Sequence, residues 1–315
     1  MVNRGASQNM VLNKKGIFFT SITIVIISLL LLSYTFYDVL QDRKTIKTRI
    51  ETMNNFLFAI NEDLERQLFA SGFRVILLLE QEITETGTYV SDLNATFNEV
   101  FFLGTVYGES NDDIELLMTG AKFQDILDSM QSKADKLNIE INMTNPLIKV
   151  YQEDPWNIKF SLTTDFTMRD KGNLALWNET KTISALIPIT NFQDPFYTIG
   201  TNGVILKKIQ KSPYTNLTNP NDLLDHAIKS YYINSIDAPS FVNKLQGNYT
   251  ADPYGVESLV NIQNFSSQGI TVKDKSIVDH VYFSASSPAN CQISGMPSWF
   301  KLDNVHQKFY SAECL

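Results

Sequence analysis

The most apolar stretch of the chain lies close to its N-terminus. From Gly16 to Tyr37 the sequence has no charged residue and no proline, and Ile, Leu, Val and Phe dominate it. An α-helix rises about 1.5 Å per residue, so the 21 residues of 17–37 span roughly 31 Å, close to the thickness of a bilayer's hydrocarbon core. The interspersed serines and threonines can bond helix carbonyls and do not oppose insertion. We therefore predict a transmembrane helix over 17–37 rather than the buried helix of a water-soluble protein.

Apolar residues at helical spacing continue beyond this run. Steps of three or four residues lead from Ile46 to Leu68, as in a heptad seam, and no proline interrupts them. The sequence predicts that the anchor continues as one helix to about residue 83, on the order of 100 Å in total. Its seam needs cover, either from a partner helix or from this chain's own downstream domain. The apolar run at 75–79 indicates that the distal half packs within a globular domain.

Beyond Pro146 the apolar positions recur with a period of two. Over 156–169 they occupy every second position, which predicts a strand with one buried face. Polar turns follow at 170–173 and at Asn202-Gly203, a type I′ pair. The result is an antiparallel meander of about five strands, predicted at 147–151, 156–169, 174–189, 196–200 and 204–209. Its apolar face must pack on another element, and the distal half of the long helix is the natural cover, so the predicted fold class is α+β.

Shorter helices and loops complete the predicted layout. Helices are expected at 89–104, 114–118, 121–137 and 221–233, with another after Pro239-Ser240. The polar residues 110–113 can cap the second of these; a cation site at Asp112 and Asp113 is the alternative, although the spacing of a calcium loop is missing. From Asn248 onward the mixture of short apolar segments with Pro, Gly and Asn predicts no topology. The domains are thus a cytoplasmic leader 1–16, a transmembrane helix 17–37, a helical stalk 38–85, a head of helices and antiparallel sheet 86–211, and a small loop-rich C-terminal domain 212–315.

Charge and cysteine content narrow the function classes. The net charge of -8 disfavours a nucleic-acid partner. Cys291 and Cys314, if paired, would close a 24-residue loop worth roughly 3 kcal/mol, and an extracytoplasmic location permits such a bond; two free thiols are the alternative. Sixteen residues precede the apolar run and nearly 280 follow it, so we expect an anchor whose C-terminal bulk lies outside the cytoplasm.

Six Asn-x-Ser/Thr sequons lie beyond the predicted anchor, as glycosylation of an outward-facing domain requires. Their asparagines are Asn94, Asn142, Asn178, Asn216, Asn248 and Asn264. A chain this rich in Asn, Ser and Thr contains several sequons by chance, so they support the predicted topology weakly.

Motifs of known enzyme classes are absent from the sequence. It has no phosphate-binding Gly-rich loop, no His-Glu-x-x-His helix, no Gly-x-Ser-x-Gly elbow and no Cys-x-x-Cys pair. The three histidines have acidic neighbours and, brought together, could ligate zinc or form acid–base pairs. They lie on separate segments, so we interpret them as unconnected surface residues: His226 with Asp222 and Asp225, His280 with Asp279, and His306 with Asp303. We expect a protein that is not an enzyme and has no cofactor or metal.

Two further groups of residues have a binding and a structural interpretation. A lysine cluster would suit an anionic polymer or is a set of solvated strand-end charges; it comprises Lys207, Lys208 and Lys211. C-terminal aromatic residues would suit a sugar or protein partner or form the core of a small domain. They are Tyr282, Phe283, Trp299, Phe300, Phe309 and Tyr310. In both cases we favour the structural interpretation.

The residues before the apolar run resemble those of a known family. Lys14-Lys15-Gly16 followed directly by Ile17 is similar to the processing site of type IV pilin-like proteins, including archaeal ones with class III signal peptides. The resemblance covers about the first 40 residues. It implies cleavage after Gly16, with Ile17 as the first mature residue. Ser21 stands where major pilins usually carry Glu, which implies a minor pilin or a pseudopilin.

The sequence as a whole favours a single-pass, surface-exposed membrane protein with a structural or assembly role. Its expected partners are membrane lipid and other pilin-like subunits, which it would contact through the N-terminal helix. A stalked ectodomain that binds a glycan or an envelope partner without polymerising is the alternative. An extracytoplasmic enzyme is the third hypothesis.

Overall fold

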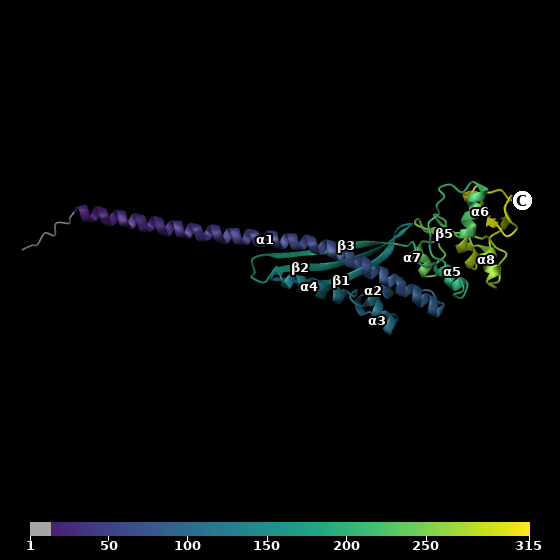
Figure 1. The fold of residues 1–315 in the computed structure, drawn as a ribbon, viewed down its shortest axis with the longest axis horizontal. Coiled ribbons are helices and arrows are strands. Elements are labelled where there is room, and N and C mark those ends of the chain that lie inside the picture. The colour runs from purple at the N-terminus through teal and green to yellow at the C-terminus, as the bar shows by residue number, and fades with distance from the viewer. Residues whose placement is uncertain (1–13) are drawn as a thin grey trace, which may run out of the picture.

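A single long helix dominates the computed structural model, which describes residues 14–315. Helix α1 (Lys14–Thr86) has 73 residues and runs without a break, on the order of 110 Å. Its first half projects from the rest of the protein, and its second half is part of an elongated head that ends with the C-terminus (Figure 1). The predicted continuous helix is thus confirmed, and it extends three residues beyond residue 83.

The head contains a three-stranded antiparallel sheet in the order β1-β2-β3. Its strands are β1 (Ile139–Asp154), β2 (Asn157–Asp170) and β3 (Leu176–Pro188). Burial alternates strictly along most of β2, as the period of two in its sequence predicts. Asn173, at a positive φ of 58°, lies in the turn between β2 and β3. The α+β fold class is therefore confirmed.

The second half of α1 packs against β3 and β2. Along α1 the seam is fully buried at Met53, Leu64 and Leu68, so the chain's own sheet supplies its cover. Ile46 and Ile50, the first two seam positions, remain 38% and 42% exposed. The seam therefore has a part inside the head that the sheet covers and a short part, on the N-terminal side of the head, that remains uncovered.

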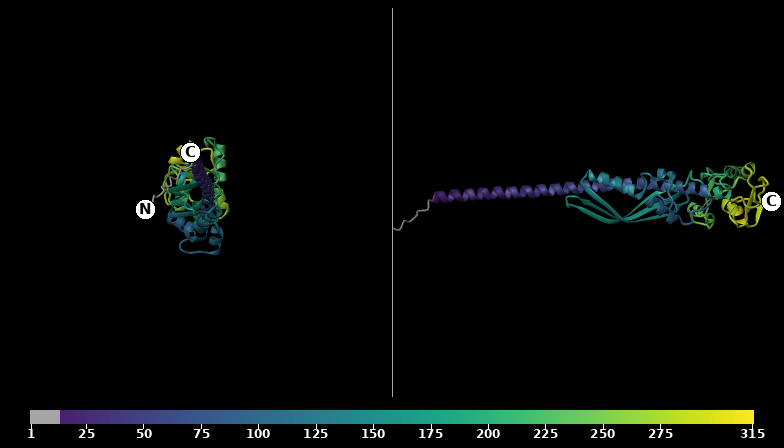
Figure 2. Two further views of the ribbon diagram at one scale, coloured as in Figure 1. Left: turned by 90° about the vertical axis from the view of Figure 1, so that its left-hand side faces the viewer. Right: turned by 90° about the horizontal axis from the view of Figure 1, so that it is seen from below.

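Helices beside α1 complete the covered face of the sheet. They are α2 (Leu93–Leu103), α3 (Asp112–Met118) and α4 (Phe123–Asp135), and α2 and α4 pack on β1. Asn111 caps α3 by accepting a bond from the Ile114 amide, which confirms the predicted cap in this polar turn. Phe97 and Phe101 of α2 both contact Phe160 of β2, and their ring centroids lie 5.2 and 5.3 Å from the centroid of the Phe160 ring. Figure 2 shows the resulting two layers, with the helices on one side of the sheet.

The C-terminal region forms the distal end of the head and is rich in loops, as predicted (Figure 1). It contains two small antiparallel pairs, β4 with β5 and β6 with β7. The elements are α5 (Pro195–Gly200), α6 (Pro220–Lys229), β4 (Tyr232–Asn234), α7 (Phe241–Leu245), β5 (Val256–Ser258), α8 (Ile262–Ser267), α9 (Asp279–Phe283), β6 (Asn290–Gln292), β7 (Lys301–Asp303) and α10 (Asn304–Phe309).

The predicted second hairpin is wrong, and the meander has three strands instead of five. Residues 195–200 form α5, which Asp194 caps by accepting a bond from the Phe196 amide, with Pro195 in the first turn. Asn202 and Gly203 do have positive φ angles, but they close the end of this helix, since the Gly203 amide donates to the Thr198 carbonyl. Residues 204–209 contribute an isolated bridge rather than a strand.

The helix predicted at 221–233 is shorter and shifted. It is α6, with Asn219 as N-cap and Pro220 in its first turn. Ser230, at a left-handed φ of 48°, ends the helix, and Tyr232 begins β4.

Candidate functional site

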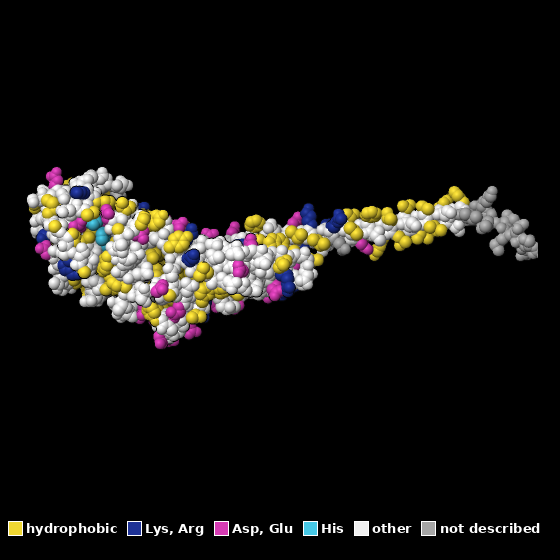
Figure 3. All heavy atoms as spheres, turned by 180° about the vertical axis from the view of Figure 1, so that it is seen from behind, with side chains coloured by type: hydrophobic (Ala, Val, Ile, Leu, Met, Phe, Trp, Pro, Cys, Tyr) yellow, Lys and Arg dark blue, Asp and Glu magenta, His cyan; other side chains and the backbone are white. Residues whose placement is uncertain are grey.

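The first half of α1 presents an apolar surface without cover from the rest of the protein. We call residues 18–48 of α1 the free rod, and every described side chain in it is exposed. Its most apolar 18-residue window has a mean hydropathy of 2.1. Within residues 18–315, this is the one helix that is long and apolar enough to cross a membrane. The hydrophobic side chains surround the rod along its outer part (Figure 3). An apolar surface of this kind requires lipid or other protein around it.

Arg49 marks the start of the packed half of α1. Its guanidinium contacts Asp170 Oδ1 through Nε at 2.5 Å, and through Nη2 it donates to the carbonyls of Leu137 and Asn138 at 2.6 and 2.9 Å. Asp170 is 2% exposed. Burial would raise the pKa of Asp170, but the bonds from the Leu174 amide and from Arg49 outweigh it and lower that pKa. Arg49 thus ties α1 to the near end of the sheet.

The predicted processing site lies at the beginning of α1. Gly16 and Ile17 belong to the first turn of the helix, which starts at Lys14. The remainder of the predicted leader, residues 1–13, lies outside the described residues. Cleavage after Gly16 stays a prediction.

All six sequon asparagines are exposed in the head. Asn94 lies on α2, Asn142 on β1, Asn178 on β3 and Asn264 on α8, and the other two, Asn216 and Asn248, lie in loops. Exposure is a condition for glycan transfer, and glycosylation itself stays a prediction.

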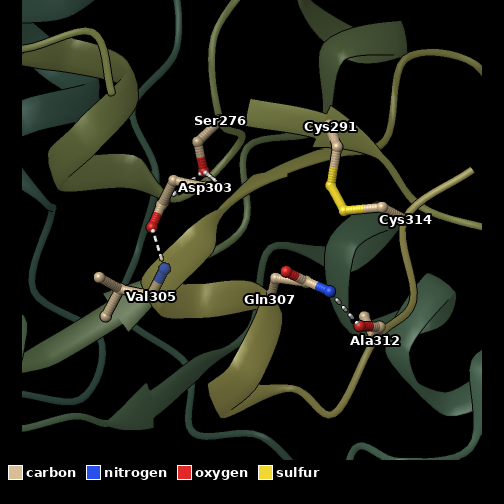
Figure 4. The surroundings of a disulfide bond; sticks show 7 residues. All are labelled: Ser276, Cys291, Asp303, Val305, Gln307, Ala312 and Cys314. Carbon is tan, nitrogen blue, oxygen red and sulfur yellow. Dashed lines mark hydrogen bonds between the residues drawn. A yellow bond between two sulfur atoms is a disulfide. The ribbon is translucent and has the colours of Figure 1, made fainter. Parts of the chain in front are cut away.

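Cys291 and Cys314 form a disulfide, with Cα atoms 5.7 Å apart (Figure 4). The bond fastens the C-terminal segment to β6, and backbone bonds support it: the Leu315 amide donates to the Gln292 carbonyl at 2.9 Å. Gln307 Nε2 of α10 donates to the Ala312 carbonyl at 3.0 Å. A disulfide indicates that this part of the protein folds in an oxidising compartment.

Lys244 lies at the centre of a buried ion cluster that the sequence analysis missed. Its Nζ donates to Asp194 Oδ2 and Asp279 Oδ2, each at 2.6 Å, and all three side chains are fully buried. Tyr232 Oη donates to Asp194, and Ser258 Oγ to Asp279. Burial alone would lower the pKa of Lys244, but the two carboxylates outweigh it and raise that pKa. The cluster joins α7 to α5 and α9, which gives it a structural role.

The interpretation of the histidines as unconnected surface residues is wrong, because all three are buried. His280 and His306 lie against each other, with ring centroids 5.2 Å apart. His306 Nε2 lies 3.4 Å from Glu257 Oε2, and its Nδ1 lies 2.7 and 2.9 Å from the two carboxylate oxygens of Asp303. Burial alone would lower the pKa of His306, but Asp303 and Glu257 outweigh it and raise that pKa to about 10. We call Glu257, His280 and His306 the Glu-His-His cluster.

His226 lies outside this cluster. Its Nδ1 is 3.1 Å from Ser212 Oγ, and burial lowers its pKa to about 4. Asp225, its predicted acidic partner, instead accepts a bond from Tyr214 Oη at 2.7 Å.

Glu257 is the residue of the cluster that sequence reasoning missed. It has no histidine near it in the sequence, but it is a lone charge in the otherwise uncharged segment 256–260. A carboxylate in such a segment has to find a partner when the segment is buried, and this was the available signal.

Two of the three clustered lysines contact different parts of the head. Lys207 donates to the Lys229 carbonyl at 2.5 Å, and Lys211 lies over the ring of Trp156, 5.0 Å from its centroid. Among the aromatic residues, Tyr282, Phe300 and Tyr310 are buried, which supports the core interpretation for these three.

A surface groove of about 490 Å³ lies beside Lys211. It is lined by aromatic and polar residues that include Trp156, Tyr214, Asn216 and Phe309. Phe309 is 46% exposed. The groove is large enough for a small ligand, and its rings can stack on the apolar face of a sugar.

A comparison of this chain with protein families, with curated proteins and with solved structures found no match.

Proposed function

We propose that this protein is a membrane-anchored, extracytoplasmic pilin-like subunit with a structural or assembly role and no catalytic one. The observation that carries the proposal is the division of α1 into two halves. The outer half is apolar and exposed, and the inner half is packed on an antiparallel sheet. The Lys14-Lys15-Gly16-Ile17 sequence at its start supports the same assignment.

In the proposed mechanism the free rod has two successive environments. It first lies in the bilayer, and after cleavage behind Gly16 it leaves lipid and packs against the rods of neighbouring subunits. The rod measures about 45 Å, which exceeds the hydrocarbon core of about 30 Å. Its last three turns, with the uncovered seam residue Ile46, therefore stand between the membrane and the head. Helix–helix packing there would cover the exposed part of the seam.

The proposed orientation places the head outside the cytoplasm. The disulfide favours an oxidising compartment for the distal end of the head. The exposure of all six sequon asparagines is compatible with glycan transfer on that side of the membrane.

The mature N-terminus tests this proposal. Full-length protein, expressed together with a prepilin peptidase, is purified from membranes and its N-terminus is determined by mass spectrometry. We expect Ile17 as the first residue, and we expect Gly16→Val to retain the leader. Gly5→Val is the matched control and should be processed normally. A membrane-embedded protein that still begins before Gly16 in the presence of active peptidase would contradict the proposal.

The aromatic groove favours a second candidate function, namely binding of a glycan by a stalked ectodomain that does not polymerise. Trp156, Tyr214 and Phe309 line it, and Lys211, whose ammonium lies over the Trp156 ring, supplies a positive charge. Tyr214→Ala and Phe309→Ala should then abolish retention of the full-length protein on a glycan array. Phe58→Ala, at an exposed ring on α1 that does not line the groove, is the control. Failure of the wild-type protein to bind any glycan would exclude this candidate.

A further inference from the structure

We propose that the Glu-His-His cluster binds a divalent metal ion of the Zn²⁺ type. Glu257 lies on β5, His280 on α9 and His306 at the start of α10, and each contributes one ligand atom. These three atoms all lie within 4.8 Å of one another. The three residues are 0%, 7% and 3% exposed, so the arrangement is enclosed by the protein.

Unpartnered polar atoms provide the second observation. In the part of the chain that the structure describes, Glu257 Oε2, His280 Nδ1 and His306 Nε2 are buried and have no hydrogen-bond partner. A buried polar atom without a partner costs about 1–3 kcal/mol, and more when the group is charged. Glu257 Oε2 and His306 Nε2 face each other at 3.4 Å, whereas His280 Nδ1 lies 3.4 Å from Asp279 Oδ1. A cation bound between Glu257 Oε2 and His306 Nε2, in place of the Nε2 proton, would satisfy both atoms.

The spacing of the two best-defined atoms fits a metal ion. Tetrahedral ligands at about 2.0–2.2 Å from zinc lie roughly 3.3–3.6 Å from one another. His306 Nε2 and Glu257 Oε2 are 3.4 Å apart, which is too long for a good hydrogen bond and suitable for two ligands of one ion. The ligand atom of His280 lies within 4.8 Å of the other two, so His280 completes the set if its ring shifts by at most about 1.5 Å.

Outer contacts hold two of the ligands in position. Asp303 bonds His306 Nδ1, which leaves Nε2 directed toward Glu257. Ser276 Oγ donates to Asp303 Oδ2 at 2.8 Å (Figure 4), and Tyr310 Oη donates to Glu257 Oε1 at 2.7 Å. A carboxylate behind a ligating histidine is the usual arrangement in zinc sites, where it orients the ring and raises its basicity.

The ligand types select among ions. Two imidazoles and one carboxylate suit Zn²⁺, whereas Ca²⁺ and Mg²⁺ prefer oxygen ligands alone. Three protein ligands leave a fourth position open for water. His280 keeps 7% of its surface exposed, which leaves the site a path to solvent, and histidine atoms are visible at the surface of the distal end of the head (Figure 3).

Metal content and a zinc titration test the proposal. Full-length protein in detergent is stripped with a chelator, dialysed, and titrated with Zn²⁺ while Tm is followed; its metal content is then measured by mass spectrometry. We expect one Zn²⁺ per chain and a rise in Tm. Co²⁺ in place of Zn²⁺ should give the visible absorption of a tetrahedral site.

Matched variants separate the proposed site from other binding. Glu257→Gln keeps the acceptor for Tyr310, and His280→Asn removes the imidazole of the third ligand. Each should weaken Zn²⁺ binding at least tenfold. His226→Asn, at a buried histidine outside the cluster, should bind Zn²⁺ as the wild type does. The proposal is overturned if the wild type takes up no stoichiometric Zn²⁺ and its Tm does not respond. Equal binding by the wild type and His280→Asn would also overturn it, because the ion would then lie elsewhere.

Discussion

Arg49 shows how a single side chain can fix the position of a long helix. Three other basic residues, Arg43, Lys44 and Lys47, follow the apolar run and are exposed, whereas Arg49 reaches Asp170 and two carbonyls of the head. The sequence gives no means of telling these four residues apart, because their different roles depend on a loop more than 80 residues away.

Replacement of Arg49 tests this attachment. In Arg49→Met the nearly fully buried Asp170 loses its cation, and we expect a loss of about 2–4 kcal/mol in the free energy of unfolding. Denaturant unfolding of the full-length protein in detergent measures it. Lys47→Met is the control, since Lys47 contacts Glu51 at 3.8 Å in an exposed pair, and it should change stability by less than about 0.5 kcal/mol. Equal effects of the two variants would contradict the assigned role of Arg49.

The buried side chain of Glu80 should make the free energy of unfolding depend on pH. It is 7% exposed on α1, and its Oε1 accepts a bond from the Gln193 amide at 2.5 Å. Burial raises the pKa of Glu80 to about 8 from its ordinary value of 4.5. The folded protein therefore keeps this proton up to about pH 8, whereas the unfolded chain releases it near pH 4.5. Stability from this group is fully present below pH 4.5 and declines as the pH rises to 8.

Glu80→Gln should remove this decline, because glutamine keeps the acceptor and has no proton to lose. Relative to wild type, we expect a gain on the order of 4 kcal/mol at pH 8 and little change at pH 4.5. Unfolding measured at both pH values provides the test. Glu85→Gln, at an exposed position of the same helix, should show no such difference between the two pH values. A constant effect of Glu80→Gln across this range would refute the assigned pKa.

At the scale of elements, the period of the hydrophobic residues predicted the long and regular helices and strands. Helix α1 and strand β2 carry their periods over more than ten residues each, so local preference and burial agree. Residues 195–200 are too short to display a period. Consecutive burial of Pro195, Phe196, Tyr197 and Thr198 suits one turn of helix inside a core, which the sequence alone does not distinguish from a buried strand.

Gly72 sets the distance between α1 and the sheet. A Cβ at this position would lie 2.4 Å from Ile187 Cδ1 and 3.0 Å from Phe160 Cδ1. Gly72→Val should therefore lower the free energy of unfolding by about 1–3 kcal/mol through overpacking. Ala70→Val, at an exposed position on the same helix, should cost only its small helix-propensity difference of about 0.5 kcal/mol. A stabilised Gly72→Val variant would show that the helix can move away from the sheet freely.

At the scale of the whole molecule, removal of the disulfide should destabilise the distal end of the head and leave the sheet unaffected. The loop between Cys291 and Cys314 contains β7 and α10, including His306. Cys314→Ser should lower stability by at most about 3 kcal/mol. Hydrogen exchange should accelerate in β6, β7 and α10 and remain unchanged in β1–β3. Equal acceleration in the sheet would mean that the two ends of the head unfold together.

The Glu-His-His cluster could not be predicted from the sequence, because it is formed by long-range contacts. The members of the Glu-His-His cluster are separated by 23 and 26 residues, and each lies on a separate short element of the loop-rich region. No periodic pattern connects such segments, so their meeting depends on the tertiary fold. The two-layer packing of α1 on the sheet was predictable, because both apolar faces are visible in the sequence and each needs a cover.

The chain enters the structure at the tip of the free rod and leaves it at the opposite extreme of the head (Figure 1). A fluorophore attached to Leu315 would therefore report height above a supported bilayer, and a second one near Thr35 would report burial in lipid. Energy transfer between the two would be weak within one upright subunit. Energy transfer would strengthen when staggered neighbours bring Leu315 of one subunit beside Thr35 of another. A single optical signal would therefore distinguish an isolated anchor from an assembled filament.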